Sequence, residues 1–207
     1  MNTESKTELK NEIDSVSYSL GVNIGSNLKK QGFSTINAEA FAQALKDVYG
    51  TQGLKINEQQ AEQLLQEYFQ GLQKKKLEGN LKEGQKFLEE NKNKPGVVTT
   101  PSGLQYLVLK EGNGPKPAAT SKVTTHYHGT LIDGTVFDSS VDRGQPATFP
   151  VNGVIKGWVE ALQLMPVGSK WRLFVPSHLA YGEQGAGPQI GPNSTLIFDV
   201  ELISIEQ

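Results

Sequence analysis

The first ninety residues carry a helical spacing of apolar side chains. In "DSVSYSLGVNIGSNLKKQG", apolar residues recur at steps of four from Val16 to Leu28, and Gly32 is placed to end a helix. Apolar and polar residues also alternate from Val16 to Ile24, as they would in a half-buried strand. Both interpretations fit the pattern, and we predict the helix.

Two more helices are predicted in this half. In "NAEAFAQALKDVYG", Asn37 can cap the helix and Gly50 can end it. The next run starts at Asn57 and meets no strong stop before Asn91, which makes a rod of roughly 50 Å at about 1.5 Å per residue. Its apolar stripe fades after Leu72, so we expect the middle of the rod to be exposed.

The pattern changes after Pro95, where glycines, prolines and β-branched residues take over. We therefore predict three parts: a helical module at 1–56, a spacer helix at 57–94 and a mostly β domain at 95–207. Two short helices and the start of a rod make too small a core to be stable alone. We therefore expect the first part to be a dimerisation module.

The second half contains runs typical of strands around one short helix at about 158–164. A tight hairpin turn is predicted at Asp133 and Gly134, between two alternating runs. On the first of these runs Val123 and Tyr127 share one face, so both should point to the core. We predict an α+β fold with an antiparallel β-sheet wrapped around the helix. Further strands are expected in "GLQYLVLKEG", "ATFPV", "SKWRLFVP" and "STLIFDVELISI".

Composition narrows the classes of function. The formal charge of the 207 residues is −2, and the longest block of one sign is the triplet at 74–76, a solvated helix face, which argues against a nucleic-acid partner. We expect no membrane span, because no apolar run approaches the roughly 18 residues required. The absence of cysteine excludes disulfides and thiolate metal sites.

Metal chemistry has little support. His126 and His128 share one strand face, and His178 could be a distant third ligand, but zinc requires three or four ligands and a supporting second layer of hydrogen bonds. We interpret the first two as solvent-facing histidines. No metal and no cofactor are expected.

Hydrolytic chemistry is also poorly supported. Asp138 and Asp142 lack an accompanying aromatic platform for a sugar. Ser139, Ser140 and Ser177 do not occur in a G-x-S-x-G elbow. The segment "GEQGAGPQIGP" lacks the Lys-Ser/Thr pair of a phosphate-binding loop and is interpreted as a mobile flap between strands.

A group of aromatic and aliphatic residues remains, and it could form a plain core or a binding site. Its members are Tyr127, Phe137, Val154, Ile155, Trp158, Tyr181 and Phe198.

The order of the motifs around these residues is informative. "HYHG…DGTVFDSS", "NGVIKGW", "LMPVGSKW", "LAYG" and "GP…STLIFDVELI" together resemble the FKBP-type peptidyl-prolyl cis–trans isomerases, over about 103–205. The first half, with "SYSLGVNIGSNLKKQG" and its long Glu/Lys/Gln rod, is similar to the dimerisation domain and spacer helix of the macrophage infectivity potentiator (Mip) group.

The resemblance implies a shallow pocket with Trp158 as its floor. Asp138 would lie at one side with Arg143 behind it, and the Ile155 N–H and the Tyr181 hydroxyl would bind substrate carbonyls. The implied walls are Tyr127, Phe137, Phe149, Val154, Ile155 and Phe198, and Ile190 is the expected contact from the flap.

Some positions depart from the family pattern. Ala147 stands where some members have a phenylalanine, so we expect that side of the pocket to be more open. In the flap, Ala186 and Gln189 replace larger or more apolar residues, and Gly191 stands where a second proline often occurs. These departures bear on substrate preference more than on the reaction.

The implied function is rotation of X-Pro bonds in peptides and unfolded proteins, with inhibition by tacrolimus- or rapamycin-like macrocycles. The implied assembly is a V-shaped homodimer joined through the N-terminal helices. The alternative is a dimeric holdase in which the pocket mainly binds clients. The resemblance suggests the periplasm, outer membrane or cell surface, with a leader absent from this chain; the cytoplasm is the alternative.

Overall fold

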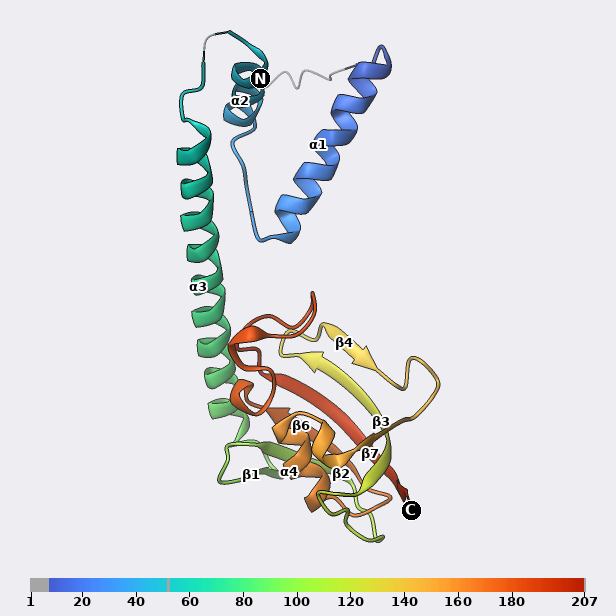
Figure 1. Cartoon of the computed structure of the whole chain (residues 1–207). Helices are drawn as coiled ribbons and strands as arrows, with labels where there is room; N and C mark the ends of the chain where they lie inside the picture. Colours follow the sequence, from blue (N-terminus) through green and yellow to red (C-terminus); the bar gives the residue numbers. More distant parts are fainter. Residues whose placement is uncertain (1–7, 52, 207) are drawn as a thin grey trace. The chain divides into compact units, whose positions relative to one another are not determined.

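The chain forms two compact units, which meet within one long helix. A computed structural model describes residues 8–51 and 53–206; residues up to 72 form the first unit and residues from 73 the second. Three helices come first, followed by seven strands and one short helix (Figure 1). The predicted α+β class is confirmed.

The first unit contains the helices that the apolar spacing predicts. They are α1 (Glu12–Lys30), α2 (Ala38–Tyr49) and the first turns of α3 (Glu58–Asn91). Each begins with an asparagine whose side-chain oxygen accepts a backbone N–H: Asn11 from Asp14 at 2.9 Å, Asn37 from Ala40 at 3.0 Å and Asn57 from Gln60 at 2.9 Å. These caps satisfy amides that have no partner inside the helix, and they set where each helix starts.

Apolar side chains of the first unit remain largely exposed. Phe33 contacts Tyr68 and Phe69 with ring centroids 5.1 and 5.3 Å apart, but every residue of the described helices α1 and α2 is at least partly accessible. The exposed large side chains of these two helices are Ile13, Val16, Tyr18, Leu20, Val22, Ile24, Phe41, Leu45, Val48 and Tyr49. So much exposed apolar surface is unusual for a monomeric protein.

The second unit is built on one antiparallel sheet. Its strands are β1 (Val97–Thr99), β2 (Gln105–Lys110), β3 (Lys122–Leu131), β4 (Val136–Ser139), β5 (Ala147–Pro150), β6 (Lys170–Val175) and β7 (Leu196–Glu206). The order across the sheet is β1-β2-β6-β7-β3-β4, and β5 pairs with β3. The hairpin turn is where the alternation predicts it, with Gly134 at φ 86°. Strand β1 was not predicted, because its three residues lie in a segment rich in turn-forming residues.

Helix α4 (Lys156–Leu164) packs against one face of this sheet (Figure 1). It begins two residues earlier than predicted, because the Ile155 carbonyl accepts the amides of Trp158 and Val159 and so starts the first turn. A Cβ at Gly157 would lie 2.6 Å from Val175 Cγ1. The glycine therefore allows the helix to approach β6 closely.

The last turns of α3 also pack in the second unit. Phe87 contacts Phe174 with ring centroids 5.9 Å apart, and Asn91 donates to Gln105 Oε1 at 2.9 Å. Gly84 is buried against Thr195. The prediction is a spacer helix over 57–94 with an exposed middle, and in the structure residues 73–94 share a compact unit with the sheet. That residues 95–207 form a domain that folds independently stays a prediction.

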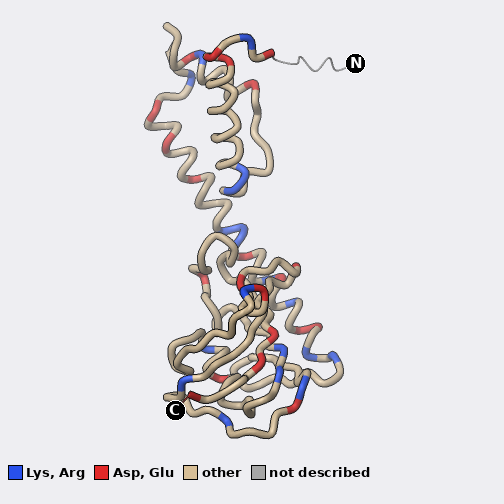
Figure 2. The backbone as a smooth tube through the Cα atoms, turned by 90° about the vertical axis from the view of Figure 1, so that its right-hand side faces the viewer, with Lys and Arg blue, Asp and Glu red and all other residues tan. Residues whose placement is uncertain are grey.

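Residues of both charge signs are spread along the described part of the chain (Figure 2). Figure 2 shows basic and acidic residues interspersed along both units, and Lys74, Lys75 and Lys76 are exposed as expected. Within residues 8–51 and 53–206, no helix combines the length and apolar character needed to cross a bilayer.

Two glycines of α3 allow a matched test of this packing. A Cβ at Gly84 would lie 2.3 Å from Thr195 Oγ1 and 3.2 Å from Thr195 Cβ, whereas one at Gly79 would have no neighbour within 4 Å. We predict that Gly84→Ala lowers the free energy of unfolding by about 1–2 kcal/mol, because overpacking outweighs the gain in helix propensity. Gly79→Ala should raise it by up to about 1 kcal/mol. Urea unfolding of both variants measures the difference, and equal effects would contradict the packing.

Candidate active site

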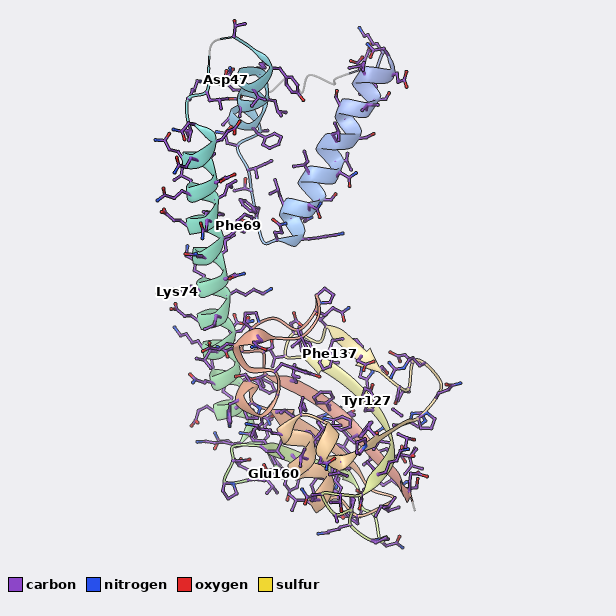
Figure 3. All side chains as sticks on the ribbon, in the orientation of Figure 1. Asp47, Phe69, Lys74, Tyr127, Phe137 and Glu160 are labelled. Carbon is purple, nitrogen blue, oxygen red and sulfur yellow. The ribbon has the colours of Figure 1, made fainter. Side chains whose placement is uncertain are left out.

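A cavity opens between the inner face of the sheet, the start of α4 and a flap, defined here as residues 185–192. Its volume is about 690 Å³. Figure 3 shows Tyr127 and Phe137, which line it from β3 and β4. The other lining residues are Asp138, Phe149, Gly153, Val154, Ile155, Trp158, Tyr181, Ala186, Gly187, Pro188, Gln189, Ile190 and Phe198.

The floor of the cavity is an aromatic cluster centred on Trp158. The Trp158 ring meets Tyr127 and Phe198 edge-on, with centroids 5.4 and 5.2 Å apart, and it meets Phe149 at 5.5 Å. Edge-to-face packing is favourable for aromatic pairs, and it holds the indole in one orientation. Trp158 is only 4% exposed, yet it lines the cavity.

Gly129 of β3 allows the walls to close around this cluster. A Cβ at this position would lie 2.7 Å from two ring atoms of Phe137 and 3.0 Å from Phe198 Cε1. Phe137 and Phe198 pack edge-to-face across it, with centroids 5.4 Å apart. A larger residue at 129 would displace both rings, so the glycine determines the shape of the pocket.

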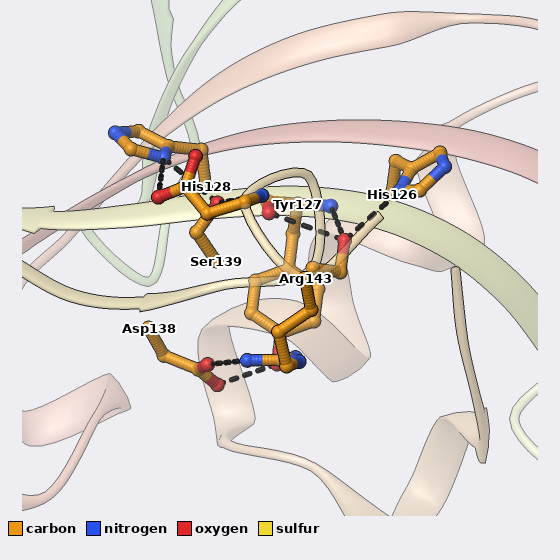
Figure 4. A network of polar contacts seen from close by, with 8 residues as sticks. His126, Tyr127, His128, Asp138, Ser139 and Arg143 are labelled. Atoms are coloured by element: carbon orange, nitrogen blue, oxygen red, sulfur yellow. Dashed lines mark hydrogen bonds and ion pairs between the residues drawn. The ribbon is translucent and has the colours of Figure 1, made fainter. Parts of the chain in front are cut away.

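One edge of the cavity is polar and is cross-linked by three side chains (Figure 4). The Tyr127 hydroxyl donates to Asp138 Oδ2 at 2.5 Å, and Arg143 donates to Asp138 Oδ1. Arg143 Nη2 also donates to the Tyr127 hydroxyl at 2.9 Å, and the guanidinium lies 5.7 Å from the Tyr127 ring centroid. Both oxygens of the carboxylate therefore have a partner, which holds the tyrosine, the acid and the arginine as a unit.

This network shifts the pKa of each of the two acidic members. Burial raises the pKa of Asp138, but the hydrogen bonds from Tyr127 and Arg143 outweigh burial, and the pKa lies below its ordinary value. Burial, followed by the hydrogen bond to Asp138, raises the pKa of Tyr127. Asp138 is thus held as a carboxylate and Tyr127 as a neutral phenol, and neither is poised to exchange a proton near neutral pH.

Two residues that line the cavity carry donors without an acceptor in the described part of the chain. Ile155 precedes α4, and among the described residues none accepts a hydrogen bond from its N–H. Tyr181 is 41% exposed at the rim, and its hydroxyl makes no hydrogen bond to any residue in the described part of the chain. Both groups are free to bind carbonyl oxygens of a ligand.

The residues implied as floor, walls and flap contact line the cavity together with Asp138 and Tyr181, and Arg143 lies behind Asp138. That residue contacts the pocket only through Asp138 and Tyr127. Ala186 and Gln189 of the flap also line the cavity, whereas Ala147 on β5 does not.

A second layer of hydrogen bonds behind Tyr127 was missed by sequence reasoning. The hydroxyl of buried Ser140 accepts the Tyr127 N–H at 2.7 Å and lies 3.0 Å from His126 Nδ1. Ser139 Oγ lies 3.0 Å from His128 Nδ1 and accepts the Asp142 N–H at 3.1 Å (Figure 4). The two histidines are partly exposed, and each is also hydrogen-bonded to a serine, a contact that the sequence did not predict. They fasten the loop that carries Arg143.

The sequence contains a hint of this layer, namely the two serines that directly follow Asp138. Ser139 pairs with His128 in the register of β3 and β4, and Ser140, directly after the end of β4, lies beside His126 of β3. Among the described residues, no group of three or more histidines, aspartates and glutamates is arranged to bind a metal, and His178 is bonded instead to the Ser102 carbonyl at 3.0 Å.

Comparisons with known proteins agree with the motif resemblance. Residues 114–203 match the family described as FKBP-type peptidyl-prolyl cis-trans isomerase, and residues 13–108 match the domain amino terminal to it. The chain is 47% identical to the outer membrane protein MIP of Legionella longbeachae, over 97% of this chain and 89% of that protein. It is also 47% identical to the FKBP-type 22 kDa peptidyl-prolyl cis-trans isomerase of Escherichia coli K12, over 91% of this chain and 93% of that protein.

Solved structures agree with the fold of the whole chain. The crystal structure of FkpA from Escherichia coli matches with a TM-score of 0.78 at 34% identity, over 96% of this chain and 99% of that chain. A peptidyl-prolyl cis-trans isomerase from Pseudomonas syringae matches with a TM-score of 0.59 at 45% identity, over 63% of this chain and 96% of that chain.

The lowered pKa of Asp138 predicts how stability depends on pH. A carboxylate whose folded pKa lies below its unfolded value stabilises the fold fully above the unfolded pKa of about 3.9. This contribution is lost as the pH falls through the folded pKa. We therefore expect Asp138→Asn to lower the melting temperature at pH 6–7, and the difference from wild type to shrink toward pH 2–3. Thermal unfolding as a function of pH measures it.

Asp142→Asn is the matched control. Asp142 lies in the same loop with its side chain 65% exposed, and its carboxylate lies 3.9 Å from His128 Nδ1, beyond hydrogen-bond distance. We expect its melting temperature to stay close to wild type throughout. An Asp138→Asn difference that is constant with pH would contradict the assigned network.

Proposed function

The chain belongs to the FKBP-type peptidyl-prolyl cis–trans isomerases, and on that premise we propose that the cavity over Trp158 is where it rotates X-Pro bonds. The observation that carries the proposal is an open apolar cavity with an indole floor and unpaired donors at its rim. Its volume of about 690 Å³ is within the usual range for ligand pockets. Proline-containing peptides and macrocyclic inhibitors of the tacrolimus and rapamycin type would compete for it.

The reaction needs no nucleophile and no proton carrier. Rotation about the X-Pro bond has a barrier of about 20 kcal/mol, because the planar amide must lose its resonance. Twisting separates the carbonyl from the nitrogen lone pair, and the twisted amide is less charge-separated than the planar one. An apolar pocket therefore solvates the twisted state better relative to the planar state, which lowers the barrier.

Different residues of the cavity bind different parts of the peptide during rotation. The Trp158 ring offers a flat apolar surface to the pyrrolidine ring. The Ile155 N–H and the Tyr181 hydroxyl bind backbone carbonyls on either side of the proline, so that the peptide is held while one bond turns. These donors are available, since neither is engaged by another described residue.

Asp138 acts as an ordering residue in this proposal. Both of its oxygens are already bonded, to Tyr127 and to Arg143, so the carboxylate is not free to accept a hydrogen bond from substrate without breaking one of these contacts. The network instead fixes the Tyr127 ring against Trp158, and with it one wall of the pocket. This also explains how a carboxylate can sit beside an apolar cavity, because a lone charge there would be costly.

We predict that Asp138→Ala lowers kcat/KM for a peptide with one X-Pro bond by about 10- to 100-fold. This range corresponds to the loss of about one hydrogen bond to a charged group, worth about 1.5–3 kcal/mol. A protease-free isomerisation assay on the full chain measures the rate. Asp142→Ala, in the same loop, should leave it unchanged. Wild-type protein that does not accelerate isomerisation would overturn the proposed function.

The first unit supports assembly into a homodimer. Val16, Leu20 and Ile24 lie at steps of four on α1, and they are 50%, 58% and 40% exposed in the single chain. A second copy of the same helices would cover this apolar stripe, in the manner of a self-complementary interface. The V-shaped arrangement stays a prediction. Two tethered pockets would raise the effective concentration of sites for one unfolded client.

We predict that the double variant Leu20→Glu/Ile24→Glu is monomeric, because two buried charges would oppose the interface. Its mass in sedimentation equilibrium should be 22.6 kDa, against twice that for wild type. Peptide isomerisation should be unchanged, and catalysis of a proline-limited refolding reaction should fall by about tenfold or more. Asn23→Glu/Asn27→Glu, at exposed polar positions of the same helix, should stay dimeric. A wild-type monomer at micromolar concentration would contradict the assembly.

The exposed apolar side chains of α1 and α2 also favour a second candidate function, that of a dimeric holdase. The two functions separate through Asp138→Ala. The holdase would be favoured if the variant still protects an unfolded client from aggregation and if wild-type protein isomerises X-Pro bonds only weakly.

For the location of the protein, we propose the periplasm, outer membrane or cell surface. The support is similarity to a protein whose name places it in the outer membrane, the MIP protein of Legionella longbeachae.

A further inference from the structure

We propose that Asn80 of helix α3 is a positioning residue for the flap that covers the pocket. The helix would then be part of the substrate-binding apparatus as well as a spacer. This inference rests on the proposed function, since it concerns the same cavity. It depends only on contacts within the second unit, between residues 73–91 and the flap.

The flap contributes one buried side chain to the cavity. Ile190 is 8% exposed, whereas Gly187, Pro188 and Gln189 at the tip are exposed. A pair of backbone hydrogen bonds links Ala186 and Ile190, with lengths of 2.9 and 3.2 Å, and forms a small closed loop. These bonds fix the shape of the tip, but they do not fix where the loop sits over the pocket.

The helix provides that attachment. Asn80 Nδ2 donates to the Pro192 carbonyl at 2.7 Å, two residues after Ile190. The side chain of Asn193 reaches back to the Leu77 carbonyl at 3.5 Å, and Asn193 is in the left-handed region at φ 53°, a conformation that asparagine tolerates better than most residues. A Cβ at Gly191 would lie 3.1 Å from Asn80 Nδ2, so the flap runs close along the helix here.

The contact is well placed to affect binding more than rotation itself. Ile190 contacts a ligand from the flap side, away from the Trp158 floor and the Asp138 network. A looser flap would weaken the binding of the planar amide and of the twisted amide by about the same factor. Loss of such uniform binding raises KM and leaves kcat nearly unchanged. A general defect in folding would instead lower kcat by reducing the amount of active protein.

The test uses the full chain with Asn80→Ala and with Asn80→Asp, which has nearly the same shape but presents an acceptor to the Pro192 carbonyl. Gln85→Ala, an exposed amide on the same helix, is the matched control. We expect both Asn80 variants to raise KM for an X-Pro tetrapeptide by about two- to tenfold, the effect of one hydrogen bond, with kcat within about twofold of wild type. The amides of Gly187 and Ile190 should show increased motion in ¹⁵N relaxation, and Gln85→Ala should match wild type.

Unchanged KM and unchanged relaxation in both Asn80 variants, with active wild type, would overturn the inference. Inactive wild type would overturn the proposed function instead. The relaxation measurement would then still decide whether Asn80 positions the flap.

Discussion

The apolar cavity above Trp158 must stay open, although apolar surfaces tend to close on one another. The rest of the second unit depends on this constraint. The side chains around Trp158 would gain by filling the space above the indole. They are prevented from doing so because three aromatic rings pack around it, Tyr127 and Phe198 edge-on and Phe149 tilted, at centroid distances of 5.2–5.5 Å. The sheet and α4 hold the backbones that carry these rings, so the pocket is a part of the core that is left unfilled.

The polar groups of the site serve the same purpose. Asp138 is not a proton carrier, because its pKa is lowered and both of its oxygens are bonded. It links the wall formed by Tyr127 to the loop that carries Arg143, and Ser140 and His126 support this link from behind. In the proposed function, bond rotation requires a rigid, water-poor surface. These hydrogen bonds hold the Tyr127 wall of the pocket rigid.

The two units use apolar surface in different ways. The second unit buries its apolar residues in one core, at and around Leu104, Leu162, Leu173 and Leu202, which are fully buried. The first unit exposes its apolar stripe on α1, which is the surface a second copy would cover. Helix α3 belongs to both units, and small or polar residues such as Gly84 and Asn80 let its last turns lie against the sheet and the flap.

The sequence by itself determined the helices and most strands, because their signals are local. The cap at Asn37, the steps of four on α1 and the turn at Gly134 act over a few residues, and the structure has them where they were predicted. The pocket residues were identified from the order of motifs resembling a family, since an apolar side chain alone does not reveal whether it faces a core or a cavity.

Only the tertiary structure decided the contacts of the last turns of α3, of the two histidines and of the two serines. Asn80 and Pro192 are 112 residues apart in the chain, and no local pattern distinguishes Asn80 or Gly84 from the other residues of the rod. Small and polar side chains carry no hydrophobic periodicity, so their burial depends on what the folded chain brings against them. The same holds for Ser140, whose hydroxyl is useful only because β3 and β4 pair in one particular register.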